Sequence, residues 1–150
     1  MKRQPVNILL VEDNEDHAEL TLRALSSDKN LLNEVHVVKD GQEALDFVHH
    51  RGKYNDITKF PLPELILLDI SLPKINGLEV LEILKKDPKL KIIPVIMLTT
   101  STRKEEITKS CACGADSYVT KPINFEDFVR KIQEIRLYLL DTNLLPKEPE

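Results

Sequence analysis

The chain has 150 residues, of which 41% are hydrophobic and 31% are charged, and its formal net charge is −4. This length allows one domain with a buried core, and the acidic charge gives no electrostatic reason to expect nucleic-acid binding. No apolar run approaches 18 residues, and the start MKRQPVNILLVED reads as neither a transmembrane helix nor a signal peptide.

Five short apolar segments have the length of β-strands. In chain order they are Val6–Val11 (VNILLV), Glu34–Val38 (EVHVV), Leu65–Leu68 (LILL), Pro94–Leu98 (PVIML) and Ser117–Thr120 (SYVT). Three of them are nearly continuous runs of Val, Ile and Leu, which is typical of strands covered on both faces, as in parallel sheets.

Segments with a helical spacing of apolar residues lie between these strands. The apolar positions are Ala18, Leu22 and Leu25, then Ala44, Leu45 and Val48, then Leu78, Leu81 and Leu84, and last Phe125, Phe128, Val129, Ile132, Ile135 and Leu139. Strand and helix alternate about five times, which predicts an α/β fold with a doubly wound, five-stranded parallel sheet and five alternating helices. Residues 49–64 are expected to form a long loop.

The cysteines and histidines give no metal site. Cys111 and Cys113 are the only cysteines, and because their spacing matches no zinc site, we expect a protein of the reducing cytoplasm. The neighbouring His49 and His50 have no histidine four residues away, as a helical zinc site would need. We interpret all four histidines, His17, His36, His49 and His50, as solvated side chains.

Polar residues follow the predicted strands at their carboxyl ends. They are Glu12 and Asp13 after the first strand, Asp69 after the third, Thr99 and Thr100 after the fourth, and Lys121 after the fifth. In a parallel sheet these ends lie at one edge, where ligands bind. Three carboxylates there would repel one another unless a cation such as Mg²⁺ bound between them. A carboxylate beside Mg²⁺ can attack phosphorus to form an acyl phosphate.

Helix capping is the alternative interpretation of these acids. Asp13 or Asn14 would cap a helix that begins near Glu15. Any one of the acids could be structural in this way, but their joint position at one sheet edge favours a functional site.

Four motifs, LLVEDN, ILLDISLPKINGLEVL, PVIMLTTS and GADSYVTKP, occur in this order between Val6 and Leu140. Together they resemble the receiver domains of response regulators in two-component signalling. The resemblance implies a flavodoxin-like fold and a single receiver domain over residues 1–150, with a core of about 6–140 and an extension at 141–150. It implies a phosphorelay function in which Mg²⁺-dependent phosphorylation of Asp69 by a histidine kinase switches a protein–protein interaction surface. The chain would be no conventional enzyme, since it would catalyse only its own phosphotransfer and autodephosphorylation.

The same resemblance assigns roles to single residues. Asp69 would be the phosphoacceptor, and the metal would be held by Glu12, Asp13, Asp69 and the backbone carbonyl of Ser71. Lys121 would contact the phosphate, and Thr99 and Tyr118 would be the switch residues.

Three less specific sequence features resemble those of the small regulators that partner bacterial phytochrome kinases. They are the long insert with GKYND, the double threonine of LTTS and the final segment LYLLDTNLLP. We therefore expect a sensor histidine kinase of phytochrome type as a partner and a homodimer through the last helix and its extension. Its interface would contain Leu137, Tyr138, Leu140 and Leu144. About ten residues follow the last helix, too few for a DNA-binding output domain, so we expect neither a nucleic-acid nor a membrane partner.

Three other functions share part of this pattern. A Mg²⁺-dependent phosphohydrolase with an aspartate nucleophile needs a second acid two residues later, where this chain has Ser71. A flavodoxin-like cofactor carrier needs a first turn that cradles phosphate, which VEDNED would repel. A receiver that acts as a phosphorylation-independent scaffold remains open, although none of the functional positions is missing.

Overall fold

The computed structural model describes residues 6–26, 33–99, 112–120, 126–127, 129–131 and 133–134. Strands and helices alternate along these ranges: β1 (Val6–Val11), α1 (Glu15–Ser26), β2 (Asn33–Val38), α2 (Gly41–Val48), the 3₁₀ helix η1 (Gly52–Tyr54), β3 (Leu65–Asp69), α3 (Gly77–Lys86), β4 (Val95–Thr99) and β5 (Ser117–Thr120). The described residues from 126 to 134 are also helical. Among the helices described, none combines the length and apolar character that crossing a membrane requires.

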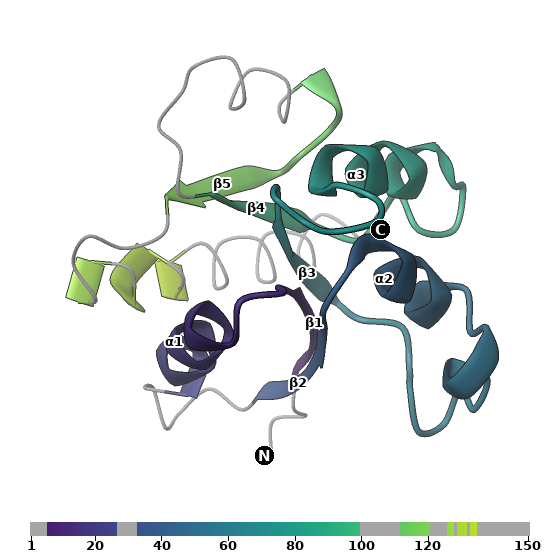
Figure 1. Ribbon diagram of the computed structural model, residues 1–150, viewed down its shortest axis with the longest axis horizontal. Coiled ribbons are helices and arrows are strands. Elements are labelled where there is room, and N and C mark those ends of the chain that lie inside the picture. The colour runs from purple at the N-terminus through teal and green to yellow at the C-terminus, as the bar shows by residue number, and fades with distance from the viewer. Residues whose placement is uncertain are drawn as a thin grey trace, which may run out of the picture.

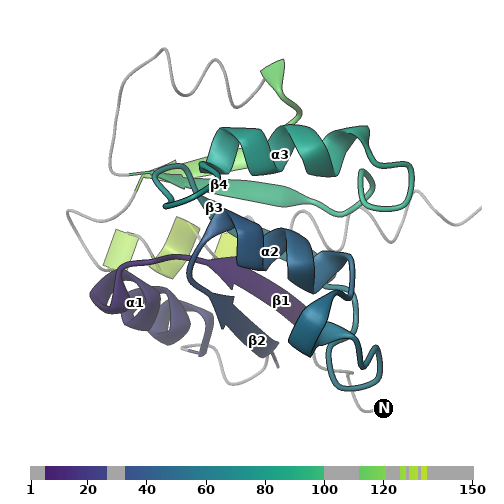
Figure 2. The same cartoon turned by 45° about the vertical axis from the view of Figure 1, so that its right-hand side comes forward.

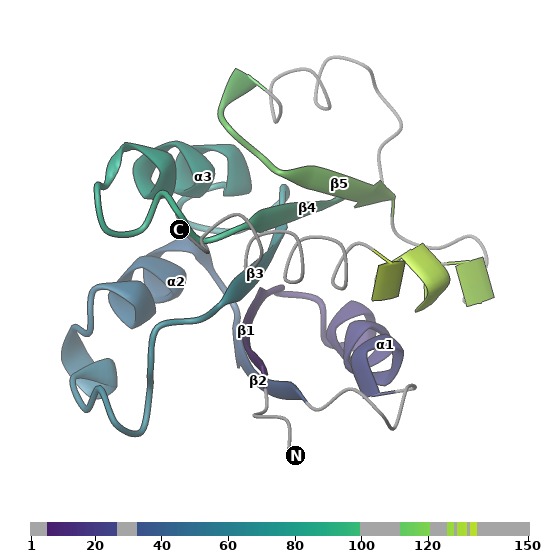
Figure 3. The same cartoon turned by 180° about the vertical axis from the view of Figure 1, so that it is seen from behind.

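The five strands form one parallel sheet in the order β2-β1-β3-β4-β5. The chain moves from β1 outward to β2, then returns past β1 to β3, so the strand order reverses between β1 and β3. Helices α2 and α3 cover one face, while α1 and the helical residues near 130 lie on the other (Figures 1 and 3). This arrangement confirms the predicted doubly wound α/β fold.

Alternation of side chains along the strands divides the core into two layers. In β1, Leu9 and Val11 belong to the layer under α2 and α3, which run side by side in Figure 2. Ile8 and Leu10 belong to the layer under α1, which Val129 also joins. Because both faces are covered, β1 and β3 can be apolar at nearly every position, which is the pattern that the sequence shows.

The segment between α2 and β3 is more ordered than a plain loop. It contains η1, and the rings of Phe47, Tyr54 and Phe60 pack with centroids 5.0–5.8 Å apart. The ring of His36 lies 5.3 Å from that of Phe47 and 5.7 Å from that of Phe60. The interpretation of His36 as a solvated residue is therefore wrong: β2 turns its ring toward this aromatic cluster.

A half-buried lysine holds the amino ends of the last two strands. Lys85 Nζ donates hydrogen bonds to the carbonyl of Ile93 (2.9 Å) and to Asp116 Oδ2 (3.3 Å). The same Asp116 oxygen accepts the N–H of Val95 at 2.8 Å. These contacts connect the start of β4 to the residue before β5. They lie at the end of the sheet opposite to the acidic residues and are therefore outside the site.

Candidate functional site

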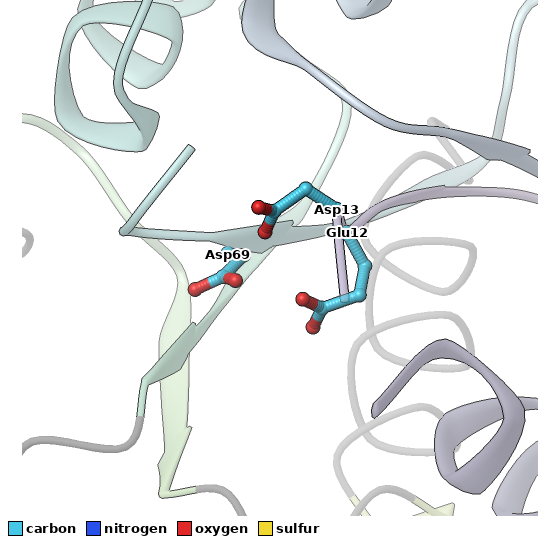
Figure 4. Close-up of side chains that lie close together, drawn as sticks. All are labelled: Glu12, Asp13 and Asp69. Carbon is cyan, nitrogen blue, oxygen red and sulfur yellow. The ribbon is translucent and has the colours of Figure 1, made fainter. Parts of the chain in front are cut away.

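Three carboxylates meet at the carboxyl edge of the sheet. Oxygens of Glu12, Asp13 and Asp69 all lie within 4.8 Å of one another, and Figure 4 shows the three side chains turned toward a common space. The strand register explains the meeting. Val11 of β1 pairs with Leu68 of β3, so the residues that follow them, Glu12 and Asp69, are neighbours.

The three carboxylates differ in their exposure. Glu12 is 1% exposed and Asp69 is 6% exposed, while Asp13 is exposed to solvent. Backbone N–H groups orient the two buried side chains: Asn14 donates to Glu12 Oε2 at 3.2 Å, and Ser71 donates to Asp69 Oδ1 at 3.1 Å. The site therefore has two fixed, buried carboxylates and one that solvent reaches.

This donor set fits a hard divalent cation. Two carboxylates taken out of water so close together are costly unless a positive charge compensates them. Carboxylate oxygens are the ligands that Mg²⁺ and similar ions prefer. The exposed carboxylate of Asp13 leaves one side of the group open, so a cation with its remaining waters can enter from solvent.

Helix capping accounts for Asn14 and not for the acids. The side-chain oxygen of Asn14 accepts the N–H of His17 at 3.0 Å, and its carbonyl accepts the N–H of Ala18 at 2.9 Å. These bonds cap the first turn of α1. Asp13 instead directs its carboxylate into the acidic group, so the two neighbouring residues divide the structural and the site roles between them.

The structure places part of the remaining predicted site. Thr99 is the last residue of β4 and follows Leu98, the partner of Asp69 across the β3–β4 ladder, so its backbone lies at the same sheet edge. Tyr118 lies on β5 and is 39% exposed. The Thr99 side chain and Lys121 lie outside the described part of the structure. So do the proposed interface residues, Leu137, Tyr138, Leu140 and Leu144.

The segment that follows Asp69 contains features that the sequence did not indicate. The N–H of Gly77, the first residue of α3, donates to the carbonyl of Ile70 at 2.8 Å, which closes residues 70–77 into a compact loop. Lys74, in the middle of this loop, has a positive φ of 68°. Lysine is not a residue type that signals such a backbone, and no sequence pattern could have located it.

The chain is similar in sequence to proteins of a known family. Residues 8–133 match the family model of the response regulator receiver domain. The chain is 39% identical over 143 residues to the probable methanogenesis regulatory protein FilR2 of Methanothrix harundinacea, with 95% of this chain and 88% of FilR2 covered. It is 37% identical over 142 residues to the response regulator Rcp1 of Synechocystis, with 95% and 94% covered.

Solved structures agree with the sequence relatives. The phosphorylated cyanobacterial phytochrome response regulator RcpA superposes with a TM-score of 0.83 at 37% identity, over 93% of this chain and 96% of RcpA. The Mn²⁺-bound form of Rcp1 superposes with a TM-score of 0.80, also at 37% identity, over 92% and 96%.

Proposed function

This chain belongs to the family of response regulator receiver domains, and from this we propose that Asp69 accepts a phosphoryl group from a sensor histidine kinase. The protein is a response regulator of two-component signalling and not a conventional enzyme. The observation that carries the proposal is the geometry of Asp69: it is buried, ends a central strand and lies within 4.8 Å of two further carboxylates.

The chemistry follows from this geometry. An oxygen of Asp69 attacks the phosphorus of the kinase's phosphohistidine, the new O–P bond forms as the P–N bond breaks, and the imidazole nitrogen that leaves takes up a proton. The N–H of Ser71 holds Asp69 Oδ1, which fixes the direction in which the carboxylate points. Mg²⁺ bound by Glu12, Asp13, Asp69 and the Ser71 carbonyl would neutralise the charge on the transferred group. We assign Lys121 a phosphate contact and Thr99 a hydrogen bond to the phosphoryl group.

The relatives support one kind of partner, and the composition supports one compartment. RcpA is a phytochrome response regulator, which supports a phytochrome-type histidine kinase as the donor. The cysteine usage supports a cytoplasmic location.

We assign the outward signal to Thr99 and Tyr118. A phosphoryl group on Asp69 offers the Thr99 hydroxyl a charged acceptor, which draws the end of β4 inward. Tyr118, exposed on the neighbouring strand, then turns inward and changes the surface next to it. We assign the contact between two copies of the chain to Leu137, Tyr138, Leu140 and Leu144, which lie outside the described residues.

Incubation with acetyl phosphate and Mg²⁺, followed by intact mass spectrometry, tests the central assignment. The parent should gain one phosphoryl group, the Asp69→Asn variant should gain none, and an Asp16→Asn control on the exposed face of α1 should behave as the parent does. Phosphate on the Asp69→Asn variant would mean that another residue is the phosphoacceptor. A parent that gains none, from acetyl phosphate or from a kinase, would indicate a phosphorylation-independent scaffold.

A further inference from the structure

The loop after Asp69 contains a strained turn. Lys74 has a φ of 68°, and the N–H of Ile75 donates to the carbonyl of Pro73 at 2.8 Å. A hydrogen bond between residues two apart around a positive φ defines the rarer, strained form of the γ-turn. A lysine gains nothing from this backbone, so the turn persists only because its surroundings hold it.

The first turn of α2 holds it. The carbonyl of Pro73 also accepts the N–H of Gly41 at 3.5 Å. A β-carbon on Gly41 would come within 2.0 Å of the carbonyl oxygen of Ile75, so Gly41 contacts the turn on both of its flanks. The side chain of Lys74 reaches back to Asp40, with 3.5 Å between Nζ and Oδ2.

Asp40 links this contact to the fold of α2. Its side chain caps the helix by accepting the N–H of Glu43 at 2.7 Å, and it is 17% exposed. One aspartate therefore caps α2 with one carboxylate oxygen and pairs with Lys74 through the other. The strained turn therefore packs against a helix end that is itself capped.

The turn lies three residues after Ser71. The loop is closed at its base by the bond from Gly77 to Ile70 and is held in its middle by α2. Only residues 71 and 72 lie between Ile70 and Pro73, the two residues held by these hydrogen bonds. The position of the turn therefore determines where the backbone of Ser71 lies. That backbone orients Asp69 and, under the proposed function, supplies a metal ligand.

We propose that Gly41 is a positioning residue, which places Ser71 and Asp69 for metal binding and phosphoryl transfer through the strained backbone turn at residue 74. The Lys74 side chain is 66% exposed, so its ion pair with Asp40 adds little to this effect. The proposal rests on the function proposed above. Backbone strain next to a reactive group is a common sign of such preorganisation. The competing explanation is that the turn only closes the loop, in which case changing it alters stability and leaves the site's affinity for metal as it was.

Two substitutions displace the turn, and two serve as controls. Gly41→Ala pushes the Ile75 carbonyl away, and Lys74→Val disfavours the positive φ. Lys74→Gly keeps that φ without strain and removes only the ion pair. Gly52→Ala, in η1, introduces a backbone penalty at a φ of 59° with no atom within 4 Å of the new β-carbon, so it destabilises the chain away from the site.

The measurement is Mn²⁺ affinity by calorimetry, at a temperature where every variant is folded, together with the rate of phosphorylation by acetyl phosphate. Gly41→Ala and Lys74→Val should bind Mn²⁺ about tenfold more weakly, the usual effect of losing a group that orients metal ligands, and should be phosphorylated more slowly. Lys74→Gly and Gly52→Ala should bind Mn²⁺ as the parent does, because the first keeps the backbone turn and the second lies away from the site.

The outcomes separate the two proposals. Parental Mn²⁺ affinity in both Gly41→Ala and Lys74→Val overturns the positioning role while the proposed function stands. If Gly41→Ala does not fold, the pair Lys74→Val and Lys74→Gly decides alone, since both keep α2 unchanged. A parent that neither binds Mn²⁺ nor accepts phosphate overturns the proposed function and the positioning role with it.

Discussion

The α-carbon of Gly77 lies directly against the backbone carbonyl of Asp69: a β-carbon at residue 77 would come within 2.1 Å of that oxygen. The start of α3 is thereby pressed onto the residue proposed to carry the phosphoryl group. Gly77→Ala must displace either the helix or Asp69. We expect a loss of about 1–3 kcal/mol in the free energy of unfolding, the range for overpacked sites, and slower phosphorylation.

Urea unfolding and acetyl phosphate labelling measure the two effects of Gly77→Ala. Ser71→Ala is the matched control, because it changes an exposed side chain in the same loop and keeps the backbone N–H that holds Asp69. The control should resemble the parent in stability. Parental stability and labelling in Gly77→Ala would show that α3 can shift without affecting the site.

Repulsion within the acidic group gives a second prediction. Asp13→Asn removes one negative charge that lies within 4.8 Å of Glu12 and Asp69 oxygens. In EDTA the variant should be more stable than the parent by about 1 kcal/mol, the energy of one charge pair at such a distance in a water-like medium. Its Mg²⁺ affinity should fall, because a hard oxygen ligand loses its charge.

Thermal melts with EDTA and with Mg²⁺ measure both parts for Asp13→Asn. Asp16→Asn, which removes an exposed acid from the first turn of α1, is the control for a change in net charge alone. A variant that is less stable than the parent in EDTA, or that gains as much from Mg²⁺, contradicts the assignment of Asp13 to the metal.

The hydroxyl of Tyr54 donates a hydrogen bond to Glu43 and gives a pH-dependent prediction. Burial alone would raise the pKa of Glu43, but the hydrogen bonds from Tyr54, Lys39 and Lys53 outweigh it and the pKa is lowered. A lowered carboxylate pKa stabilises the fold above the ordinary value of about 4.3 and loses this contribution as the pH falls below it. Tyr54→Phe should cost about 1–2 kcal/mol at pH 7, and the difference from the parent should shrink below about pH 4.

The pKa of Tyr54 is shifted in the opposite direction to that of Glu43, so its effect on stability occurs at alkaline pH. Burial, and then the hydrogen bond to Glu43, raises the pKa of Tyr54. A raised tyrosine pKa stabilises the fold below the ordinary value of about 10 and loses this contribution as the pH rises above it. The stability difference between parent and Tyr54→Phe should therefore be largest near neutrality and decline at both ends. A difference that is flat from pH 3 to 11 would mean that the hydroxyl contributes no charged hydrogen bond.

The proposed switch predicts a change in exposure at Tyr118, which is 39% exposed on β5. The chain has no tryptophan, so Tyr118→Trp introduces a single tryptophan whose fluorescence reports on this position. Beryllofluoride with Mg²⁺ should reduce its quenching by acrylamide, since the ring should turn inward. Ile92→Trp, at a residue 65% exposed just before β4, is the control and should not respond. Equal quenching of the Tyr118→Trp variant with and without the mimic would exclude the switch at this residue.

If the chain forms the proposed dimer, the strength of its self-association should depend on the last segment. Leu140→Glu or Leu144→Glu places a charge in the apolar surface that would join two copies, so association should weaken by about 2 kcal/mol or more, as for central interface residues. Sedimentation velocity with and without beryllofluoride gives the oligomeric state, and Ile57→Glu, at an exposed residue between α2 and β3, is the control. A parent that is monomeric under both conditions would assign this surface to another partner.

Several elements were predictable from the sequence because they depend on local pattern. The apolar runs from Val6 and from Leu65 indicated strands covered on both faces, since a strand buried on both sides needs an apolar side chain at every position. The acids Glu12, Asp13 and Asp69 were predictable as a group for a related reason. Parallel strands bring their carboxyl ends to one edge, so residues far apart in sequence meet there.

Contacts between elements could not be predicted from local pattern, because they form only when the chain folds. Nothing in a lysine indicates the positive φ of Lys74, because that backbone is imposed by the docking of Gly41 from another helix. His36 was misread for the same reason: its neighbours Phe47 and Phe60 are 11 and 24 residues away and reach it only after the chain folds. Periodicity reports which face of a segment is buried, while partner, distance and strain depend on what packs against that face. Local pattern was therefore enough to predict the sheet and its acidic edge, whereas the way in which the residues at that edge are held depends on how α2 and α3 pack.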